Sequence, residues 1–426
     1  MKSNIGKFFI NILNHPEIIF AIIAIFFGIR FLFLTPPNCV PDESSHIFRS
    51  CEIADGILYS KEPVKITKYD KYFESIISKR DSNNFHFASR YSAIMYLPTA
   101  TAIKLGGKFL DNDKAIFYFG RLCNLLMYII LISIAIKITP IFKYPFLFSG
   151  LLPMALYEGM SYSADSFNTA FAFLFFAYLF KLIFNKDKIT KKEFSLLSCF
   201  SIIGAFCKGI IYPVFLYFFI PLKKNKILFI LPLIILTIFI SYYWASINPK
   251  NLNPLHCVLN NPMYLFQNFF DVFKITYLTT INEFYVYTKG LIGILGLLSI
   301  FLPSDIYIQT IIIFFSMLFV LGEKIPYNIK ITSFLLLIIS YFAILYIELI
   351  YWTPINSDLI TGVQGRYFIP LLPFLFIVLT TDKIKLSQEY KYYFKTFIIL
   401  FIIYMLNTTC NILHLYYYEL GINITM

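Results

Sequence analysis

The sequence predicts an all-α integral membrane protein, built as a bundle of about 11 transmembrane helices. Two observations lead to this prediction. The chain of 426 residues is 58% hydrophobic and only 14% charged, which is more apolar surface than a soluble domain can bury. Long apolar runs also recur along the whole chain. They are continuous rather than alternating, which excludes a transmembrane β-barrel.

Each predicted span is an apolar run that approaches the roughly 20 residues a helix needs to cross the hydrocarbon core. The runs are residues 17–35, 116–137, 145–159, 166–184, 194–207, 210–221, 227–247, 305–322, 331–351, 366–381 and 396–413. They predict one polytopic domain over residues 1–426. Two longer loops interrupt it, at residues 36–115 and 248–304.

The net charge of +12 is distributed as in a membrane protein rather than a nucleic-acid-binding one. Lysines gather in short loops such as "NKDKITKK" (185–192) and "DKIKLSQEYKYYFK" (382–395), whereas "GMSYSAD" and "WTPINSDLITGVQG" contain no Lys or Arg. Because basic loops stay on the cytoplasmic side, we expect a multi-pass protein of the inner (plasma) membrane. Its N-terminus would be cytoplasmic and its two long loops extracytoplasmic. No nucleic-acid partner is expected.

Both long loops carry apolar segments of their own. In the first, "SRYSAIMYLPTATAIKLGGKFL" is moderately apolar and typical of a helix lying on the membrane surface. The second ends with "KGLIGILGLLSIFLP", a stretch interrupted by glycines that is typical of a re-entrant segment.

Charged residues follow directly after the first span, in "PPNCVPDESSHIFRS" (36–50). Asp42 lies eight residues past the last apolar position, which places it near the lipid headgroups. Pro41 suits the first position of a helix. On such a helix Asp42, His46 and Arg49 share one face, with Glu43 beside them. The alternative is an ordinary helix start, because acids stabilise a helix N-terminus.

Two further motifs place charge at the same side of the membrane. "SYSADS" (161–166) puts Asp165 at the entrance of the fourth span, where it would otherwise act as a helix cap. "GVQGRYFIPLLP" (362–373) puts Arg366 behind two glycines that permit close approach of the backbone to a ligand. Gln364 adds a hydrogen-bond donor, and an arginine suits bidentate phosphate binding. Alternatively, Arg366 only extends its charge to the interface.

Lys208 lies in "FCKGIIYP", between the fifth and sixth apolar runs. A cation within the membrane costs about 2.5–3.5 kcal/mol on insertion scales, so it usually faces a cavity or marks a site. A short external turn is the alternative.

Three segments together resemble a known family: "VPDESSHIFR", "LLPMALYEGMSYSADSFNTAFAFL" and "GVQGRYFIPLLP", in that order. They are similar to the motifs of a bacterial polytopic membrane family, formerly of unknown function, that is grouped with the GT-C glycosyltransferases. The resemblance implies a GT-C-like bundle whose first extracytoplasmic loop carries a catalytic acid. It further implies transfer of a sugar from a polyprenyl-phosphate-linked donor to a cell-surface glycan or lipid acceptor.

On that basis we expect an inverting transfer with Asp42 as general base and Glu43 as the alternate base. The remaining candidate residues would bind substrate, above all the lipid phosphate of the donor: His46, Arg49, Asp165, Lys208, Gln364 and Arg366.

Such a transferase needs no nucleotide, because its donor arrives activated on lipid. No cofactor is assigned with certainty, although Asp42, Glu43 and Asp165 are suited to share a divalent cation. The competing hypotheses are a transporter or flippase, or a polymerase, of lipid-linked saccharides. A transporter predicts inverted repeats, which the sequence does not show.

Overall fold

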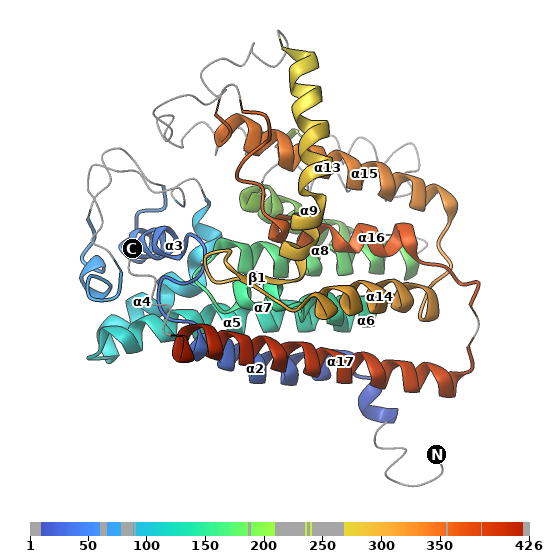
Figure 1. Ribbon diagram of the computed structural model, residues 1–426, viewed down its shortest axis with the longest axis horizontal. Coiled ribbons are helices and arrows are strands. Elements are labelled where there is room, and N and C mark those ends of the chain that lie inside the picture. Colours follow the sequence, from blue (N-terminus) through green and yellow to red (C-terminus); the bar gives the residue numbers. More distant parts are fainter. Residues whose placement is uncertain are drawn as a thin grey trace.

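The computed structural model describes residues 10–59, 66–77, 88, 91–185, 189–208, 235–236, 239–240, 268–354, 357–384 and 386–420. This part of the chain is helical throughout, apart from loops and one two-stranded hairpin (Figure 1). Its main helices are α2 (Pro16–Leu34), α3 (Glu43–Ala54), α4 (Leu97–Phe109), α5 (Asp113–Ile138), α6 (Lys143–Gly150), α7 (Pro153–Gly159), α8 (Ala164–Asn185), α9 (Lys191–Lys208), α13 (Phe269–Gly293), α14 (Ser304–Val320), α15 (Tyr327–Tyr351), α16 (Leu372–Leu379) and α17 (Gln388–His414). Short turns complete it: η1 (Asp70–Tyr72), η3 (Ala93–Tyr96), η6 (Gly365–Leu371) and η7 (Leu415–Glu419).

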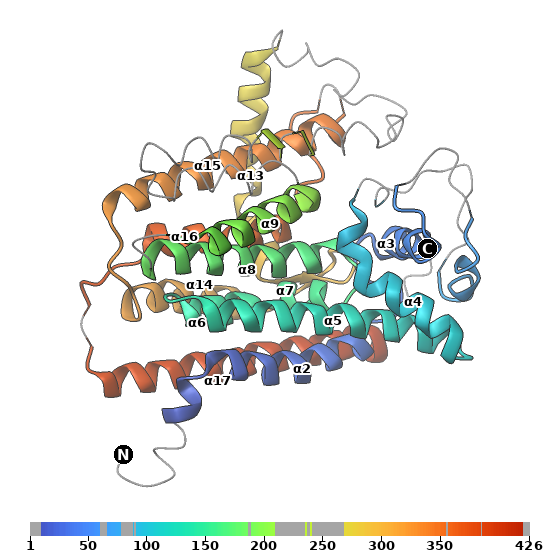
Figure 2. The same ribbon diagram turned by 180° about the vertical axis from the view of Figure 1, so that it is seen from behind.

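Within the described residues, five helices are long and apolar enough to cross a membrane: α2, α5, α8, α15 and α17. They run roughly side by side, with α6, α14 and α16 between them (Figure 2). Two shorter apolar helices, α14 and the continuous η6–α16 segment, lie in the same bundle. The chain is therefore an all-α membrane protein.

The predicted number of eleven spans is not confirmed. The run at 145–159 forms two short helices, α6 and α7, because Pro153 starts a new helix after a turn at 151–152. The run at 194–207 forms α9. The run at 210–221 lies outside the described residues, and 227–247 is described only at 235–236 and 239–240.

The helix α8 stands at the centre of the bundle. Every side chain from 168 to 180 is buried, and α8 packs against α5, α7, α9 and η6. Phenylalanines fill this core, as where Phe176 meets Phe374 edge-on with ring centroids 4.7 Å apart. Because α8 is fixed on all sides, Asp165 in its first turn stands on a rigid element.

The connections between helices sort into two ends of the bundle. At one, here called the basic end, the Tyr144 hydroxyl donates to the carbonyl of Leu13 (2.8 Å), and the Glu323 N–H donates to Thr380 (2.9 Å). Lysines lie in or beside the connections between α5 and α6, α8 and α9, α14 and α15, and α16 and α17: Lys137, Lys143, Lys191, Lys192, Lys324, Lys330, Lys383, Lys391 and Lys395.

At the opposite end, here called the site end, α2, α15 and α17 finish and α5, α8 and η6 begin (Figure 1). The chain between α2 and α5 adds α3, η3 and α4 there. The helix predicted within "SRYSAIMYLPTATAIKLGGKFL" is present as α4, which packs on α3 and α5.

The glycine-interrupted stretch forms the end of α13 and then a hairpin. Strands β1 (Ile294–Leu295) and β2 (Ile300–Phe301) pair antiparallel, and Gly296 adopts a φ of 62° in the turn. Glycine suits this left-handed conformation, which explains the break that the sequence shows. A re-entrant path of this stretch through the membrane stays a prediction.

Candidate active site

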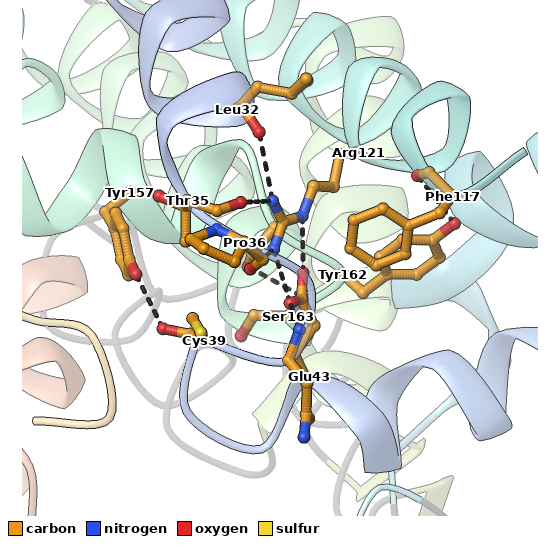
Figure 3. A network of polar contacts seen from close by, with 12 residues as sticks. Leu32, Thr35, Pro36, Cys39, Glu43, Phe117, Arg121, Tyr157, Tyr162 and Ser163 are labelled. Atoms are coloured by element: carbon orange, nitrogen blue, oxygen red, sulfur yellow. Dashed lines mark hydrogen bonds and ion pairs between the residues drawn. The ribbon is translucent and has the colours of Figure 1, made fainter. Parts of the chain in front are cut away.

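A buried arginine fixes the loop that follows the first transmembrane helix (Figure 3). Arg121, on α5, donates from Nε and Nη2 to the two carboxylate oxygens of Glu43, at 2.8 and 2.6 Å. Its Nη1 donates to the carbonyls of Leu32 (3.2 Å) and Thr35 (2.6 Å), and its Nη2 to that of Pro36 (3.1 Å). One guanidinium thus holds the end of α2, the loop and the start of α3 together.

Further contacts set the course of this loop. The Tyr157 hydroxyl donates to the carbonyl of Cys39 at 2.8 Å (Figure 3), and the Asn38 N–H donates to Glu43 at 3.1 Å. Asn38 and Asp42 both adopt a φ of 60°, in the left-handed region that Asn and Asp tolerate best among non-glycine residues. Asp42 therefore precedes α3 rather than lying within it, and the helix begins two residues later than predicted.

The side chain of Asp42 reaches a second buried arginine, on η6. Arg366 Nη2 lies 3.2 Å from Asp42 Oδ2, Nη1 lies 2.6 Å from Glu158 Oε1, and Nε lies 3.3 Å from Asp165 Oδ2. The four side chains, here called the acid–arginine cluster, come from the three sequence motifs. Segments that the sequence places far apart thus meet at one guanidinium.

The three carboxylates of the acid–arginine cluster differ in their access to solvent. The side chain of Asp42 is 48% exposed, whereas those of Glu158 and Asp165 are 4% and 13% exposed. A buried guanidinium needs opposite charge beside it to offset its desolvation. The buried carboxylates of Glu158 and Asp165 supply that charge to Arg366. Asp42 is the carboxylate that a substrate can reach.

Glu43 differs from its neighbour Asp42. Its side chain is fully buried, and Arg121 occupies both of its oxygens. The geometry therefore does not favour Glu43 as an alternate base. Glu43 instead anchors the loop that presents Asp42.

The two glycines of the third motif allow close packing against neighbouring helices, with backbone at Gly365 and with a side chain at Gly362. A Cβ on Gly365 would lie 2.3 Å from the carbonyl oxygen of Tyr287 on α13. A Cβ on Gly362, whose φ is 89°, would lie 2.8 Å from the carboxylate of Glu348 on α15. We expected these glycines to admit a ligand, but their close neighbours are α13 and α15. The tight packing fixes η6, and with it Arg366.

His46 contacts two tyrosines of the chain between α2 and α5. Its Nδ1 lies 2.7 Å from the Tyr96 hydroxyl, and its ring stacks on Tyr91 with centroids 5.9 Å apart. Desolvation, together with the carboxylates of Asp165 and Asp42, raises the pKa of the Tyr91 hydroxyl. Tyr91 thus stays protonated near the cluster.

Arg49 does not join the acid–arginine cluster. It is buried, lies 2.8 Å from the Glu52 carboxylate and donates to the carbonyl of Leu58 at 2.6 Å. The shared helix face predicted for Asp42, His46 and Arg49 therefore does not form a single site. Arg49 closes the turn after α3.

The remaining candidates are Gln364 and Lys208. Gln364 directly precedes η6, and its side-chain oxygen is buried without a hydrogen-bond partner among the described residues. Lys208 is the last residue of α9, a helix that contacts η3 at the site end. The structure describes only the backbone of Lys208, so its phosphate-binding role stays a prediction.

A shared divalent cation is not supported by the arrangement of the acids. Glu43 is held by Arg121, away from the pair formed by Asp42 and Asp165 with Arg366. Within the residues that the structure describes, no group of three or more His, Cys, Asp or Glu side chains is placed to hold a metal ion.

Sequence reasoning missed Glu158 and Arg121. Glu158 holds Arg366, and Arg121 holds Glu43 and the loop that presents Asp42. Both lie in apolar runs that were assigned to transmembrane spans, 145–159 and 116–137. A charged residue in such a run is costly and usually marks a site, which is the signal that identifies both.

The fold and the acid–arginine cluster define a class: polytopic α-helical membrane proteins with a charged site at one end of the bundle. The chain belongs to the family described as predicted membrane protein (DUF2142), whose model matches residues 61–375. The second and third motifs lie within this match, and the first precedes it. No curated protein and no solved structure matches the chain.

Proposed function

We propose that this protein is a membrane glycosyltransferase of GT-C type. It transfers a sugar from a polyprenyl-phosphate-linked donor to a cell-surface glycan or lipid acceptor outside the cytoplasm. The observation that carries the proposal is the convergence of all three motifs on Arg366, with Asp42 as the exposed carboxylate. The resemblance of these motifs to a family grouped with such enzymes gives the reaction class.

The position of Asp42 suits a lipid-linked substrate. It follows the end of α2 by eight residues, so it stands near the level where a lipid phosphate would lie. The lysine-bearing connections between helices lie at the basic end, opposite the end of the bundle where α3 lies (Figure 1). Under the positive-inside rule, the basic end is then cytoplasmic and the site end extracytoplasmic.

The proposed reaction is an inverting displacement at the anomeric carbon of the donor sugar. The Asp42 carboxylate accepts the proton of an acceptor hydroxyl, and the oxygen of that hydroxyl forms the new glycosidic bond. The bond from the anomeric carbon to the phosphate oxygen breaks, and the polyprenyl phosphate leaves with the electron pair. No nucleotide takes part, because the donor is already activated.

Arg366 fits a positioning role in this reaction better than direct phosphate binding. All of its three nitrogens face a carboxylate, so its charge is already balanced within the acid–arginine cluster. Its Nη2 orients Asp42, while Glu158 and Asp165 lie beside Nη1 and Nε. Lys208, at the end of α9, remains the proposed cation for the leaving phosphate.

The test is formation of a glycosylated product by the purified protein in vesicles that contain a defined polyprenyl-phosphate sugar and a mixture of acceptor lipids and glycans. We expect wild-type protein to release polyprenyl phosphate and form product. The competing transporter hypothesis predicts that the intact donor crosses the vesicle membrane without cleavage. That result in the same vesicles would overturn the proposed function.

A further inference from the structure

A pocket outside the acid–arginine cluster lies between α2 and α17, near the site end. It has a volume of about 390 Å³. Ile29 and Phe33 of α2 supply apolar wall, and Arg30, Asn411 and His414 supply polar groups. Helix α17 ends at His414, where a run of tyrosines begins. Tyrosines gather at the headgroup level, so the pocket lies close beneath the headgroups.

The α2–α17 pocket opens on the lipid-facing side of the bundle. Ile29 and Phe33 are 38% and 58% exposed, whereas Phe31, on the other face of α2, is buried. Phe31 packs edge-on against Tyr157, beside the loop that presents Asp42. The body of α2 therefore separates this pocket from the acid–arginine cluster. Because the pocket opens towards the membrane, a lipid of the surrounding leaflet can enter it.

Arg30 places a positive charge in this apolar surface. Its guanidinium lies 5.8 and 5.7 Å from the ring centroids of Phe26 and Phe27, and it donates to the Asn407 amide oxygen at 3.0 Å. These partners are neutral, and within the described part of the chain no carboxylate lies within ion-pair distance of Arg30. A cation set in apolar surface is costly, and an anionic partner would offset part of that cost.

We propose that the α2–α17 pocket binds the phosphate group of an anionic phospholipid from the surrounding leaflet. Arg30 supplies the opposite charge, and its bond to Asn407 fixes the direction of its remaining N–H groups. The Asn411 amide and the His414 ring, which Glu419 holds at 3.2 Å, complete the polar rim. The acyl chains lie along the exposed apolar side chains of α2, such as Ile22 and Phe26.

The test measures thermal unfolding of delipidated protein in a neutral detergent, titrated with one lipid at a time. Phosphatidylglycerol should raise the unfolding temperature of wild type, and diacylglycerol with the same chains should not. Arg30→Gln should weaken the apparent affinity for phosphatidylglycerol by at least about tenfold, because a charge-assisted contact is lost. Arg30→Lys should be intermediate, because lysine keeps the charge but not the planar donors.

Two further variants sharpen the result. Lys104→Gln removes an exposed cation from α4 and should leave the response to phosphatidylglycerol unchanged. Asn411→Leu alters the rim but not the bond between Arg30 and Asn407, so it should weaken binding even if Arg30→Gln fails to fold.

Equal responses of wild type, Arg30→Gln and Asn411→Leu would overturn the proposal. If Arg30→Gln cannot be purified, a response of Asn411→Leu to phosphatidylglycerol equal to that of wild type would also overturn the proposal. Stabilisation by polyprenyl phosphate but not by phosphatidylglycerol would also overturn it, because the pocket would then serve the donor. The readout does not depend on sugar transfer, so the proposed function can fail without affecting this result.

Discussion

The guanidinium of Arg366 lies 2.6 Å from the carboxylate of Glu158, although 208 positions separate the two residues in the sequence. Glu158 is the second-last residue of the short helix α7, and Arg366 is the second residue of η6, which follows α15. Their pairing joins two halves of the bundle and sets the direction in which Arg366 meets Asp42. The candidate site therefore depends on tertiary packing between motifs rather than on any one motif.

The two neighbouring acids of the first motif should behave differently when neutralised. Asp42→Asn removes the proposed proton acceptor and should lower the transfer rate by about 10²–10⁴-fold. Its folding should persist, since the side chain is half exposed and Asn tolerates the left-handed backbone. The measurement is the initial rate of sugar transfer, beside the unfolding temperature. Full activity of Asp42→Asn would show that the motif only shapes the loop.

Glu43→Gln is the matched control for that experiment. It leaves Arg121 buried without its carboxylate, so we expect lower stability. Activity per folded molecule should fall far less than in Asp42→Asn. If Glu43→Gln lost transfer at unchanged stability while Asp42→Asn kept it, the two acids would have exchanged roles.

Glu158→Gln should change catalysis although the Glu158 side chain is buried and does not contact the substrate. The neutral amide still accepts a hydrogen bond from Arg366, but it no longer balances the charge. With one of its carboxylates neutralised, Arg366 can shift towards Asp165, so Asp42 should be less well oriented for proton transfer. We expect kcat to fall while KM changes little. Glu52→Gln, which alters another buried acid–arginine pair, should lower stability and leave kcat unchanged.

Arg366→Lys tests whether this arginine positions Asp42 or binds the donor phosphate. A lysine keeps the charge but offers one nitrogen in place of the three that face carboxylates, so transfer should fall by at least about tenfold. Protection from thermal unfolding by polyprenyl phosphate should persist, because Arg366 is already paired. Loss of that protection would assign the arginine to the phosphate instead. Arg49→Lys, at a buried arginine beyond the cluster, serves as the control.

Arg121 should be the largest single contributor to stability among the charged residues of the loop network. Arg121→Gln strands the buried Glu43 carboxylate and several carbonyl oxygens, which typically costs about 3–5 kcal/mol. Thermal unfolding in detergent measures the loss. Adding Glu43→Gln should recover part of the lost stability. Lys114→Gln, on the exposed surface of the same helix, should leave stability unchanged. Additive losses in the double variant would argue against a direct partnership.

The orientation in the membrane can be measured with single cysteines. Lys68, whose side chain is 69% exposed at the site end, should be accessible to an impermeant thiol reagent in intact cells after replacement by Cys. A cysteine at Lys324, at the basic end, should react only after the cells are opened. The reverse pattern would place Asp42 on the cytoplasmic side and contradict an extracytoplasmic transfer.

Composition and periodic apolar runs determined the membrane class and most of the described helices. The spans predicted at 17–35, 116–137, 166–184 and 331–351 correspond to α2, α5, α8 and α15 within a few residues. These features are local, because a membrane helix satisfies its backbone hydrogen bonds within its own segment. The same local reasoning singled out Asp42, Asp165 and Arg366 from charges at the ends of apolar runs.

Tertiary structure alone decided what each charge does. Asp42 and Glu43 are chemically similar neighbours. Glu43 is buried against Arg121, whereas Asp42 is half exposed beside Arg366. Sequence could not separate them, because the partner that makes the difference lies 78 positions away on another helix. The free energy of a buried charge depends on which opposite charge the fold brings beside it, and this pairing is fixed only when the helices pack.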